Sequence, residues 1–399
     1  MPPLDQQDII PTAAIEAVLQ PSAVAKGMPN AAYSDPALFE FERDAVLGKT
    51  WAAIAFISEL PSKGYVKPVE FMGLALALMR TREGEINVFH NVCSHRGMTL
   101  VLEEAAVPGS LRCPYHSWTY DLHGNLKGTP NIGGMGVHNV DDFVCENHGL
   151  QAVRCALWMG MIFVNLSGDA EDFDSYIAPL MQRWEPFVGS DGLNELQLTT
   201  DGSSLQLEIG ANWKLAVENY CESYHLPMVH PGLNSYSPLD QHYNIMIDDR
   251  MSGQGSSSYT LSEVAGTALP QFEHWPAEKV RQAEYISLYP NVLLGIQADH
   301  FFALILQPLS HDRTLEKLQL SYVGEQATGD NFAACRAAVL ESWRVVFAED
   351  VFAVEGMQKG RRSPAFEGGL FTPVQDVATH HFHRWVANHY MAATHVESE

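Results

Sequence analysis

The sequence predicts an α+β protein in which an all-β module is followed by a larger module with a large antiparallel sheet covered by helices. Short apolar runs between residues 51 and 165, broken by Gly, Pro and Asn, are typical of strands in an all-β module. Longer alternating segments at 285–307 and 317–323 predict antiparallel strands, and helical spacing of apolar residues predicts helices at 334–360 and 374–390. Strands and helices in separate runs indicate the α+β class.

The length of 399 residues is sufficient for two or three domains. We predict an N-terminal helical extension over residues 1–47, with a helix at 36–47, that packs with the C-terminal module. The all-β module is expected to span residues 48–168. The α+β module is expected to span residues 169–399, after a polar and acidic junction at 169–174.

The first part of the C-terminal module contains further predicted elements. The pattern predicts a helix over 173–187 and strands over 193–208 with a turn at 201–202. Another helix is expected over 212–224 and should end before Pro227, because proline does not fit the interior of a helix.

Composition restricts the possible partners and compartment. The net charge of −24 argues against nucleic acids and anionic membranes as partners. The longest apolar stretches, such as 155–164, are shorter than the roughly 20 residues that span a bilayer. Residues 1–20 lack the basic and apolar regions of a signal peptide. These observations predict a cytoplasmic protein.

Six cysteines are present, and four of them lie outside any recognisable motif. These four are Cys145, Cys155, Cys221 and Cys335. Because their surroundings are apolar, we expect them to be buried thiols rather than disulfides. Free thiols are consistent with the cytosol.

Two mixed pairs of cysteine and histidine form the first candidate metal site. They read C-S-H at Cys93 and His95 and C-P-Y-H at Cys113 and His116, with 17 residues between His95 and Cys113. This order matches a Rieske [2Fe–2S] centre, in which two thiolates hold one iron and two imidazoles hold the other. Zinc is the main alternative, but in zinc fingers each pair usually contains one residue type. The pattern therefore predicts a Rieske cluster.

A second candidate site has the form carboxylate-x₂-His-x₄-His, at Glu222, His225 and His230. On a helix, Glu222 and His225 would share one face. Pro227 would then break the helix and let His230 turn back toward the same point. Two histidines suit Fe(II), which needs one more carboxylate for a facial triad with positions open for O₂. Two core histidines are the alternative, and the Rieske pairs in the same chain favour the metal.

The third iron ligand is expected on the helix at 338–360. Its apolar stripe comprises Val339, Trp343, Val346, Phe347, Val354 and Met357. Asp350 falls on this stripe, whereas Glu349 is displaced from it. Because a buried carboxylate needs a partner, we predict Asp350 as the ligand, with Glu349 and Glu355 as reserve candidates. The alternative is a buried Asp350 that pairs with an arginine or caps a bend.

Taken together, the chain resembles the catalytic α subunit of Rieske non-heme iron oxygenases over nearly its whole length. The shared features are C-S-H-R-G at 93–97, C-P-Y-H-S-W at 113–118, N-W-K at 212–214, E-N at 218–219, E-S-Y-H at 222–225, H-P at 230–231, and E-D at 349–350 with Gln358 further on.

The resemblance implies a head-to-tail trimer in which the cluster of one subunit lies beside the mononuclear iron of the next. A carboxylate bridges the two centres, and by position it would be Glu222, joining His116 of one chain to His225 of its neighbour. Much of the family has Asp there. The Glu resembles the branch that acts on quaternary amines, such as choline, glycine-betaine and carnitine monooxygenases. Since Glu is one methylene longer, the helices are expected to be slightly farther apart.

The function that follows is that of a terminal oxygenase. A separate NAD(P)H-dependent reductase, with or without a ferredoxin, would supply electrons, because the chain shows no Gly-rich dinucleotide motif. Electrons would pass through His116, Glu222 and His225 to iron that uses O₂. Hydroxylation of an N-methyl group would lead to demethylation with loss of formaldehyde. Asn219, one turn before Glu222, is a candidate hydrogen-bonding group near the iron, although a structural role for Glu218 and Asn219 is equally expected.

The substrate is predicted less directly. Glu222 and the acidic composition favour a quaternary amine, and an aromatic cage could recognise one. The candidates for this cage are Tyr236, Tyr243, Phe301 and Phe302, which could also be core residues. Hydroxylation of an aromatic ring or aromatic acid is the alternative. Alternatives of another class are a Rieske electron carrier and an inactive partner subunit.

Two other polar groups are expected to have no metal-binding role. The predicted C-terminal helix carries a cluster of three histidines, His380, His381 and His383. Asp376 precedes His380 by four residues, but we expect a solvated or interface helix rather than a metal site. Lys214 lies four residues before Glu218, a spacing typical of a pair on a helix surface.

Overall fold

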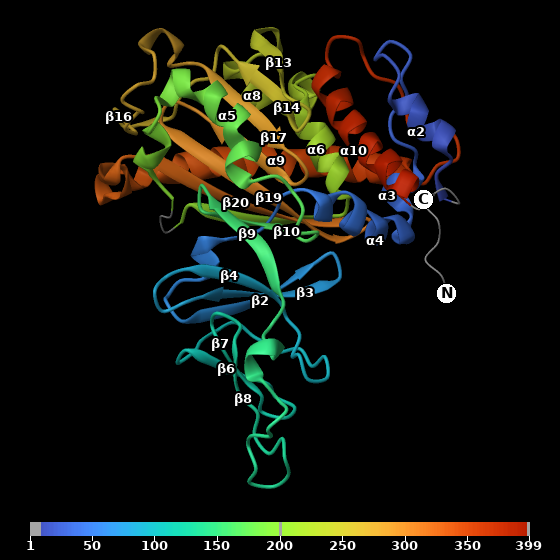
Figure 1. Ribbon diagram of the computed structural model, residues 1–399. Helices are drawn as coiled ribbons and strands as arrows, with labels where there is room; N and C mark the ends of the chain where they lie inside the picture. The colour runs from blue at the N-terminus through green and yellow to red at the C-terminus, as the bar shows by residue number, and fades with distance from the viewer. Residues whose placement is uncertain (1–8, 199–201, 397–399) are drawn as a thin grey trace. The chain divides into compact units, whose positions relative to one another are not determined.

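The computed structural model describes residues 9–198 and 202–396. It divides the chain into two compact units. One unit holds residues 53–170, and the other combines the residues up to 52 with those from 171 onwards. The predicted α+β class is confirmed, since one unit is built from strands and the other joins helices to a large sheet (Figure 1).

The unit of residues 53–170 contains a seven-stranded sheet and a three-stranded sheet. The larger sheet has the order β1-β10-β9-β4-β3-β2-β5. Its strands are β1 (Ala52–Phe56), β2 (Tyr65–Phe71), β3 (Leu74–Arg80), β4 (Ile86–His90), β5 (Ala105–Ala106), β9 (Ala152–Trp158) and β10 (Met161–Asn165). The smaller sheet comprises β6 (Ser110–Arg112), β7 (Thr119–Asp121) and β8 (Leu126–Gly128).

The second unit is built on an antiparallel sheet of order β11-β20-β19-β18-β17-β14-β13, in which β12 also pairs with β20. Its strands are β11 (Leu196–Gln197), β12 (Ser204–Ile209), β13 (His242–Ile247), β14 (Met251–Ser256), β17 (Ala283–Leu288), β18 (Val292–Ile296), β19 (His300–Ser310) and β20 (Arg313–Val323). A small hairpin is formed by β15 (Glu263–Val264) and β16 (Thr267–Ala268). The segment predicted at 285–307 is divided among three strands, because turns at 289–291 and 297–299 reverse the chain.

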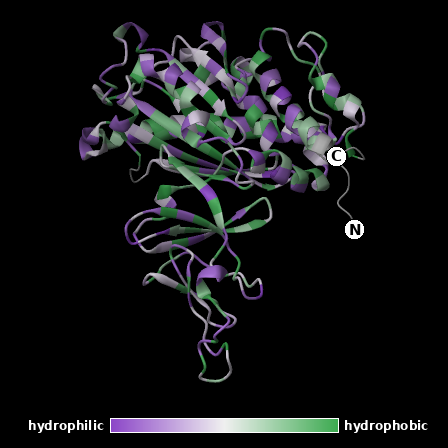
Figure 2. Cartoon of the chain, viewed as in Figure 1, coloured by the Kyte–Doolittle hydropathy of each residue, from purple (hydrophilic) through white to green (hydrophobic). Residues whose placement is uncertain are grey.

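Helices pack on this sheet and on one another. They are α2 (Thr12–Val18), α3 (Ala31–Ser34), α4 (Pro36–Ala45), α5 (Phe173–Val188), α6 (Trp213–Cys221), α7 (Leu226–Val229), α8 (Pro231–Tyr236), α9 (Ala333–Gly360) and α10 (Val377–Val396). Helices α6, α9 and α10 contact strands of the sheet, and α2 contacts α10. Helix α6 contacts β14, β17 and β19 as well as α9 and α10. The strands β17 and β18 are buried along their whole length, and apolar residues concentrate in this central part (Figure 2).

The long helix α9 follows the predicted apolar stripe over most of its length. Val339, Trp343, Phe347 and Val354 are buried, whereas Met357 is 37% exposed. The prediction that Met357 belongs to the buried stripe is therefore wrong. Its neighbour Gln358 is buried instead and donates a hydrogen bond from Nε2 to the Tyr33 carbonyl (3.0 Å).

The histidines of α10 tie the N-terminal segment to the second unit. His380 is buried, and its Nε2–H donates to the Val18 carbonyl (2.8 Å), while its Nδ1 lies 2.8 Å from the hydroxyl of Ser22. His383 is also buried, and its Nδ1 accepts a hydrogen bond from the Met28 N–H (3.0 Å). We expected a solvated or interface helix, and the solvated alternative is wrong here, because these side chains satisfy backbone groups of a packed segment.

The six cysteines form no disulfide, as predicted for the four that lie outside the motifs. Cys221 and Cys335 are buried, whereas Cys145 and Cys155 are only partly buried. Among the described residues, no helix is both long and apolar enough to cross a bilayer.

Candidate metal centres

The two Cys/His pairs lie on two loops with the same backbone geometry. In the first loop, Cys93 N–H donates to the carbonyl of Met98 (2.8 Å), and Gly97 N–H donates to the carbonyl of Cys93 (3.0 Å). In the second loop, Cys113 and Trp118 form the equivalent bond (2.8 Å), and the Ser117 N–H donates to the Cys113 carbonyl (3.0 Å). Gly97 and Ser117 have φ values of 73° and 61°. The left-handed conformation of Gly97 in the first loop is thus repeated at a serine in the second loop.

The four side chains differ in exposure. Cys93 and Cys113 are 1% and 2% exposed, whereas His95 and His116 lie closer to the surface. The ring centroids of the two histidines are 4.6 Å apart. The ring of His95 also stacks on that of Trp118, with the same distance between centroids. Burial raises the pKa of the Cys93 thiol, although the Tyr120 hydroxyl 3.2 Å from Sγ acts in the opposite direction.

The donor set fits a Rieske cluster. Two buried thiols are in hydrogen-bond contact with each other, and two imidazoles lie next to each other. Within the described part of the chain, Nδ1 of His116 is buried and has no hydrogen-bond partner. A buried nitrogen without a partner is costly, and coordination of a metal would satisfy it.

The backbone around the second site differs from the predicted single helix. Helix α6 ends at Cys221, and Glu222 is extended, with φ −126° and ψ 160°. Glu222 and His225 therefore do not share one helix face. Instead, the Glu222 carboxylate accepts the backbone N–H groups of Tyr224 and His225 and holds a tight turn. Pro227 lies in the first turn of α7 and begins a helix rather than ending one, because its missing N–H needs no partner there.

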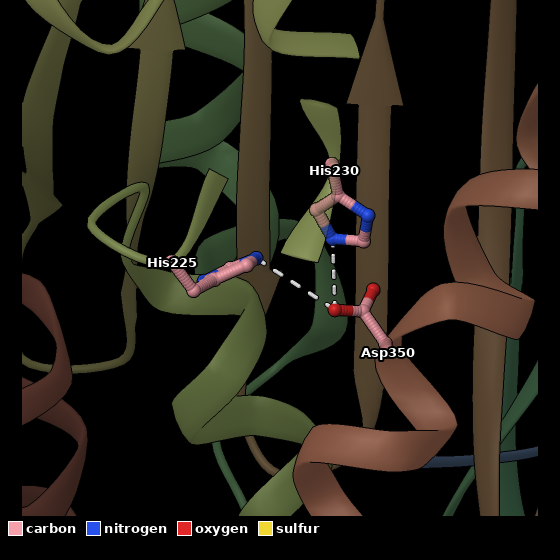
Figure 3. Close-up of side chains that lie close together, drawn as sticks. All are labelled: His225, His230 and Asp350. Atoms are coloured by element: carbon pink, nitrogen blue, oxygen red, sulfur yellow. Dashed lines mark hydrogen bonds and ion pairs between the residues drawn. The ribbon is translucent and has the colours of Figure 1, made fainter. Parts of the chain in front are cut away.

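The turn brings together three potential ligands (Figure 3). One ligand atom each from His225, His230 and Asp350 lies within 4.8 Å of the others. Oδ1 of Asp350 is 2.9 Å from Nε2 of His230 and 3.7 Å from Nε2 of His225. The side chains of His225 and Asp350 are 15% and 17% exposed, and that of His230 is 2% exposed. Two imidazoles and one carboxylate in this arrangement fit Fe(II) with open coordination positions.

A carboxylate holds the far side of each imidazole. Nδ1–H of His225 donates to Oε1 of Glu222 (2.6 Å), and Nδ1–H of His230 donates to Oε2 of Glu349 (2.8 Å). These bonds assign the tautomers and leave both Nε2 atoms facing Asp350. Burial alone would lower the pKa of His230, but Asp350 and Glu349 outweigh it and raise that pKa.

The reserve candidates have other contacts. Glu349 contacts His230 from the side opposite Asp350. Glu355 accepts a hydrogen bond from the Gly210 N–H (2.9 Å) and lies outside the three-residue group. The sequence shows that Glu349 is displaced from the apolar stripe, but only the fold shows that it reaches Nδ1 of His230.

A narrow pocket opens onto the three potential ligands. Asn219 is 9% exposed and lies in its wall. The aromatic residues of the wall are Tyr220, Tyr285, Trp343 and Phe347. Trp343 and Phe347 precede Asp350 by seven and three residues on α9, so helical spacing could have identified them as neighbours of the site.

The predicted aromatic cage is not found at this pocket. Its lining does not include Tyr236, Tyr243, Phe301 or Phe302. Phe301 and Phe302 are core residues, 1% and 0% exposed. Phe302 packs behind the pocket wall, with its ring centroid 4.5 Å from that of Trp343. The strand positions of Tyr243, Phe301 and Phe302 allowed either face of the sheet, and none of the three lines the pocket.

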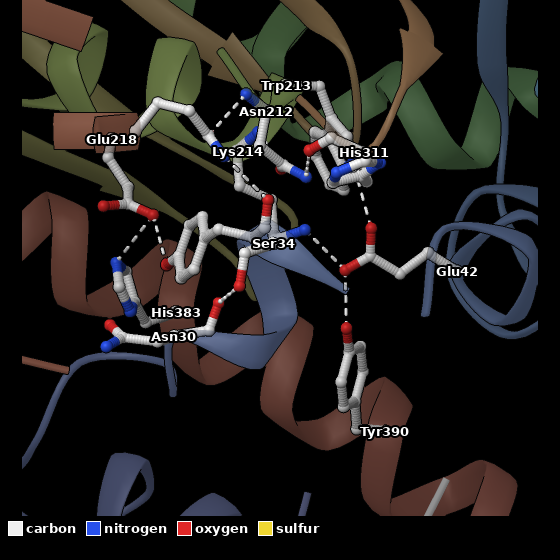
Figure 4. Close-up of polar contacts among 12 residues, drawn as sticks. Asn30, Ser34, Glu42, Asn212, Trp213, Lys214, Glu218, His311, His383 and Tyr390 are labelled. Atoms are coloured by element: carbon white, nitrogen blue, oxygen red, sulfur yellow. Dashed lines mark hydrogen bonds and ion pairs between the residues drawn. The ribbon is translucent and has the colours of Figure 1, made fainter. Parts of the chain in front are cut away.

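A buried ionic network holds the helix that leads into the site (Figure 4). Lys214 on α6 is fully buried, and its Nζ lies 2.5 Å from Oε1 of Glu42 on α4. Trp213 and Tyr390 also donate hydrogen bonds to the Glu42 carboxylate (3.1 and 2.5 Å). Burial lowers the pKa of Lys214, although Glu42 acts in the opposite direction. The predicted surface pair of Lys214 with Glu218 is wrong, because α6 is covered by the N-terminal segment and α10.

Glu218 belongs to the second half of this network. Its carboxylate accepts a hydrogen bond from the hydroxyl of Tyr33 (2.5 Å) and lies 3.3 Å from Nε2 of His383 and 3.4 Å from Arg361. The two halves therefore fix α6 at its first turn, through Trp213 and Lys214, and about one turn before its end, through Glu218. Since Glu222 follows α6 directly, the network positions the turn that carries the potential ligands.

We expect Lys214→Met to destabilise the second unit by about 3 to 5 kcal/mol, because Glu42 would remain buried without its cation. Urea unfolding followed by tryptophan fluorescence would measure this change. Arg313→Met is the matched control, since Arg313 and Glu208 form an ion pair with side chains 55% and 49% exposed. A similar midpoint for both variants would contradict the assignment.

Glu218 is expected to make the stability depend on pH in the acid range. Burial alone would raise its pKa, but His383 and Arg361 outweigh burial and lower the pKa to about 2, from an ordinary value of about 4.5. Because the folded pKa lies below the unfolded one, Glu218 contributes about 3 kcal/mol above pH 4.5 or so and loses it as the pH falls toward 2. The difference in unfolding free energy between the wild type and Glu218→Gln should therefore shrink over this range. A difference independent of pH would contradict this prediction.

Comparison with known proteins agrees with both sites. The model of the Rieske [2Fe–2S] domain matches residues 50–143, and the model of the ring hydroxylating alpha subunit (catalytic domain) matches residues 196–392. The chain belongs to the catalytic α subunits of the Rieske non-heme iron oxygenases. It is thus an oxidoreductase, and its two domains indicate a [2Fe–2S] cluster and a mononuclear iron.

Individual relatives are oxygenase subunits of monooxygenases. The carnitine monooxygenase oxygenase subunit of Escherichia coli (strain K12) is 27% identical over 341 residues, which cover 84% of each chain. The glycine betaine monooxygenase oxygenase subunit of Pseudomonas aeruginosa is 33% identical over 208 residues, 52% of this chain and 45% of that protein. A crystal structure of the quaternary ammonium Rieske monooxygenase CntA has a TM-score of 0.75 at 22% identity and covers 94% of this chain and 98% of its own. An oxygenase subunit of this kind acts on a small molecule and works with a separate reductase.

Proposed function

We propose that this chain hydroxylates an N-methyl group of a quaternary ammonium compound, such as a betaine, choline or carnitine. The observation that carries the proposal is the convergence of His225, His230 and Asp350 at an aromatic-lined pocket. Relatives named for carnitine and glycine betaine support the substrate class. Consumption of O₂, two electrons and two protons would give the hydroxymethyl product and water, and loss of formaldehyde would complete demethylation.

The metal-binding residues divide between the two units. We assign the [2Fe–2S] cluster to Cys93, His95, Cys113 and His116. We assign the mononuclear Fe(II) to His225, His230 and Asp350. When bound, these centres supply electron transfer and the activation of O₂.

The protein's own residues orient the ligands and the substrate. Glu222 and Glu349 keep the proton of each histidine on Nδ1, so that both Nε2 atoms are free for coordination. Trp343 and Phe347 provide aromatic faces toward the pocket, and such faces attract quaternary ammonium groups. Asn219 lies in the same wall and offers an amide for hydrogen bonding.

We propose a homotrimer in which Glu222 of one subunit accepts a hydrogen bond from His116 of the next. Exposed apolar side chains surround both residues on their own units and support this contact. Tyr115 is 58% exposed beside His116, and Tyr224 and Met228 are 55% and 86% exposed after Glu222. A solved structure of a quaternary ammonium Rieske monooxygenase is described as revealing insights into inter-subunit electron transfer in that protein.

The electrons would come from NAD(P)H through a separate reductase, with or without a ferredoxin. The free thiols support a cytoplasmic location.

Product analysis tests the proposed function. Purified protein would be supplied with reductase, NADH and a panel of choline, glycine betaine, carnitine and aromatic acids. We expect formaldehyde or a hydroxylated product from a quaternary amine, and about three irons per chain. Turnover of aromatic acids alone would favour the alternative substrate class. Two irons per chain, unchanged in His225→Ala, would indicate an electron carrier, and no O₂ uptake with any substrate would indicate an inactive partner subunit.

A further inference from the structure

Glu316 differs from the other buried acidic residues that the structure describes. Those others are Glu42, Glu218, Glu284 and Asp299, and each has a basic partner. Glu316 is 6% exposed, and no hydrogen bond or ion pair reaches its carboxyl group within the described ranges. Burial, together with the charge of Asp350, raises its pKa to about 8.

The position of Glu316 in the sheet explains its isolation. It lies on β20 opposite Leu306 of β19 and Leu207 of β12, so its neighbours across the sheet are apolar. Helix α9 contacts β12. The carboxyl group therefore lies between two apolar strands and near the helix that carries Asp350.

Glu316 lines a narrow chamber that adjoins the substrate pocket. Four residues line both cavities, namely Asn219, Tyr220, Phe347 and Asp350. The remaining wall of the chamber is apolar and consists of Ile209, Ala216, Leu293, Val351 and Val354. Glu316 is thus the polar end of a small chamber that begins at an iron ligand.

Such a carboxyl group suits a ligand that brings its own positive charge. A buried carboxylate without a counter-charge is unfavourable, and nothing in the chamber wall is basic. Glu316 does not belong to the group of three convergent potential ligands. A quaternary ammonium group has no N–H to donate, and it can be recognised only by charge and by aromatic faces. Glu316, with Tyr220 and Phe347, provides both.

We propose that Glu316 is a specificity-determining residue that holds the cationic head group of the substrate beside the mononuclear iron. This inference rests on the proposed function and deepens it, because it names the residue that selects a cation over a neutral molecule. It also places the N-methyl carbons next to Asp350, where the oxygen is to be delivered.

Binding of tetramethylammonium tests the inference without turnover. Isothermal titration calorimetry would compare the iron-loaded wild type with iron-loaded Glu316→Gln. The uncharged counterpart of choline is 3,3-dimethylbutan-1-ol, in which a tert-butyl group replaces the trimethylammonium group. We expect tetramethylammonium and choline to bind about 30-fold more weakly to Glu316→Gln, since truncation of one partner of a buried charge pair has at least that effect. Affinity for the uncharged alcohol should stay within about twofold.

Controls separate recognition from folding. Glu355→Gln changes a carboxylate on α9 that lies outside both cavities and should leave all affinities unchanged. Glu316→Asp keeps the charge and should retain the preference for the cation. Because Glu316→Gln removes an unpaired buried carboxylate, we expect its melting temperature to equal or exceed that of the wild type. A loss of affinity in this variant would therefore not be caused by unfolding.

The outcomes distinguish this inference from the proposed function. Equal affinity of the wild type and Glu316→Gln for tetramethylammonium, or an equal loss for the cation and the alcohol, would overturn the role of Glu316 while N-methyl oxidation could still be observed. Failure of the wild type to bind any quaternary ammonium ion would overturn the inference as well. The product panel alone decides whether the proposed function fails.

Discussion

Replacing Asp350 by alanine is expected to remove the mononuclear iron and to lower turnover at least about 1,000-fold, while the Rieske cluster stays intact. Asp350 supplies the single carboxylate among the three convergent donors, and its Oδ1 lies near both imidazoles. Two histidines alone hold Fe(II) weakly. Iron analysis should fall from about three to about two per chain, and the visible spectrum of the cluster should be unchanged.

Glu355→Ala is the matched control for Asp350→Ala. It removes a carboxylate from the same helix, but this carboxylate accepts a hydrogen bond from the Gly210 N–H and is not one of the potential iron ligands. It should retain the iron and the activity. If Asp350→Ala kept about three irons while Glu349→Ala lost one, the ligand would be Glu349, and the roles of the two adjacent carboxylates would be exchanged.

Replacing Glu222 by glutamine is expected to lower turnover about 10- to 100-fold while both iron centres remain bound. Its carboxylate accepts Nδ1–H of His225 at 2.6 Å and also holds the backbone turn at Tyr224. The amide keeps the size of the side chain but removes the negative charge that orients and polarises the imidazole. Steady-state turnover, iron content and the rate at which the reduced cluster is reoxidised by O₂ in the presence of substrate would be measured together.

Glu222→Asp completes this test, since it keeps the charge but shortens the side chain by one methylene. We expect an intermediate rate, because the carboxylate can no longer reach His225 and a neighbouring subunit equally well. Normal reoxidation of the cluster in Glu222→Gln would refute a role for Glu222 between the two centres. Loss of the mononuclear iron would reveal a structural role in the ligand turn instead.

Residues that are close in sequence could be assigned before the fold was known. The mixed pairs at 93–95 and 113–116 have a spacing that few other sites use, and the structure places them on two equivalent loops. His225 and His230 are separated by only one short helix, so the local chain is sufficient to bring them together. Asp350 was distinguishable because helical periodicity places it, and not Glu349, on the buried stripe of α9.

Other features depend on contacts between distant segments. The sequence indicated aromatic residues for a substrate cage, but a strand position does not tell which face meets a pocket, and Phe301 and Phe302 belong to the core. Lys214 and Glu218 have the spacing of a surface pair, yet the N-terminal segment and α10 cover α6 and give each of them a different partner.

The sequence by itself determined the α+β class and the oxygenase family, and it predicted the two sets of candidate metal donors, because ligand type and local spacing specify them. Only the tertiary structure decided that Glu349 holds the second histidine, which aromatic residues line the pocket, and that Glu316 is a buried acid without a cation. The physical reason is that burial and counter-charge are properties of segments far apart in the chain, and packing alone brings those segments into contact.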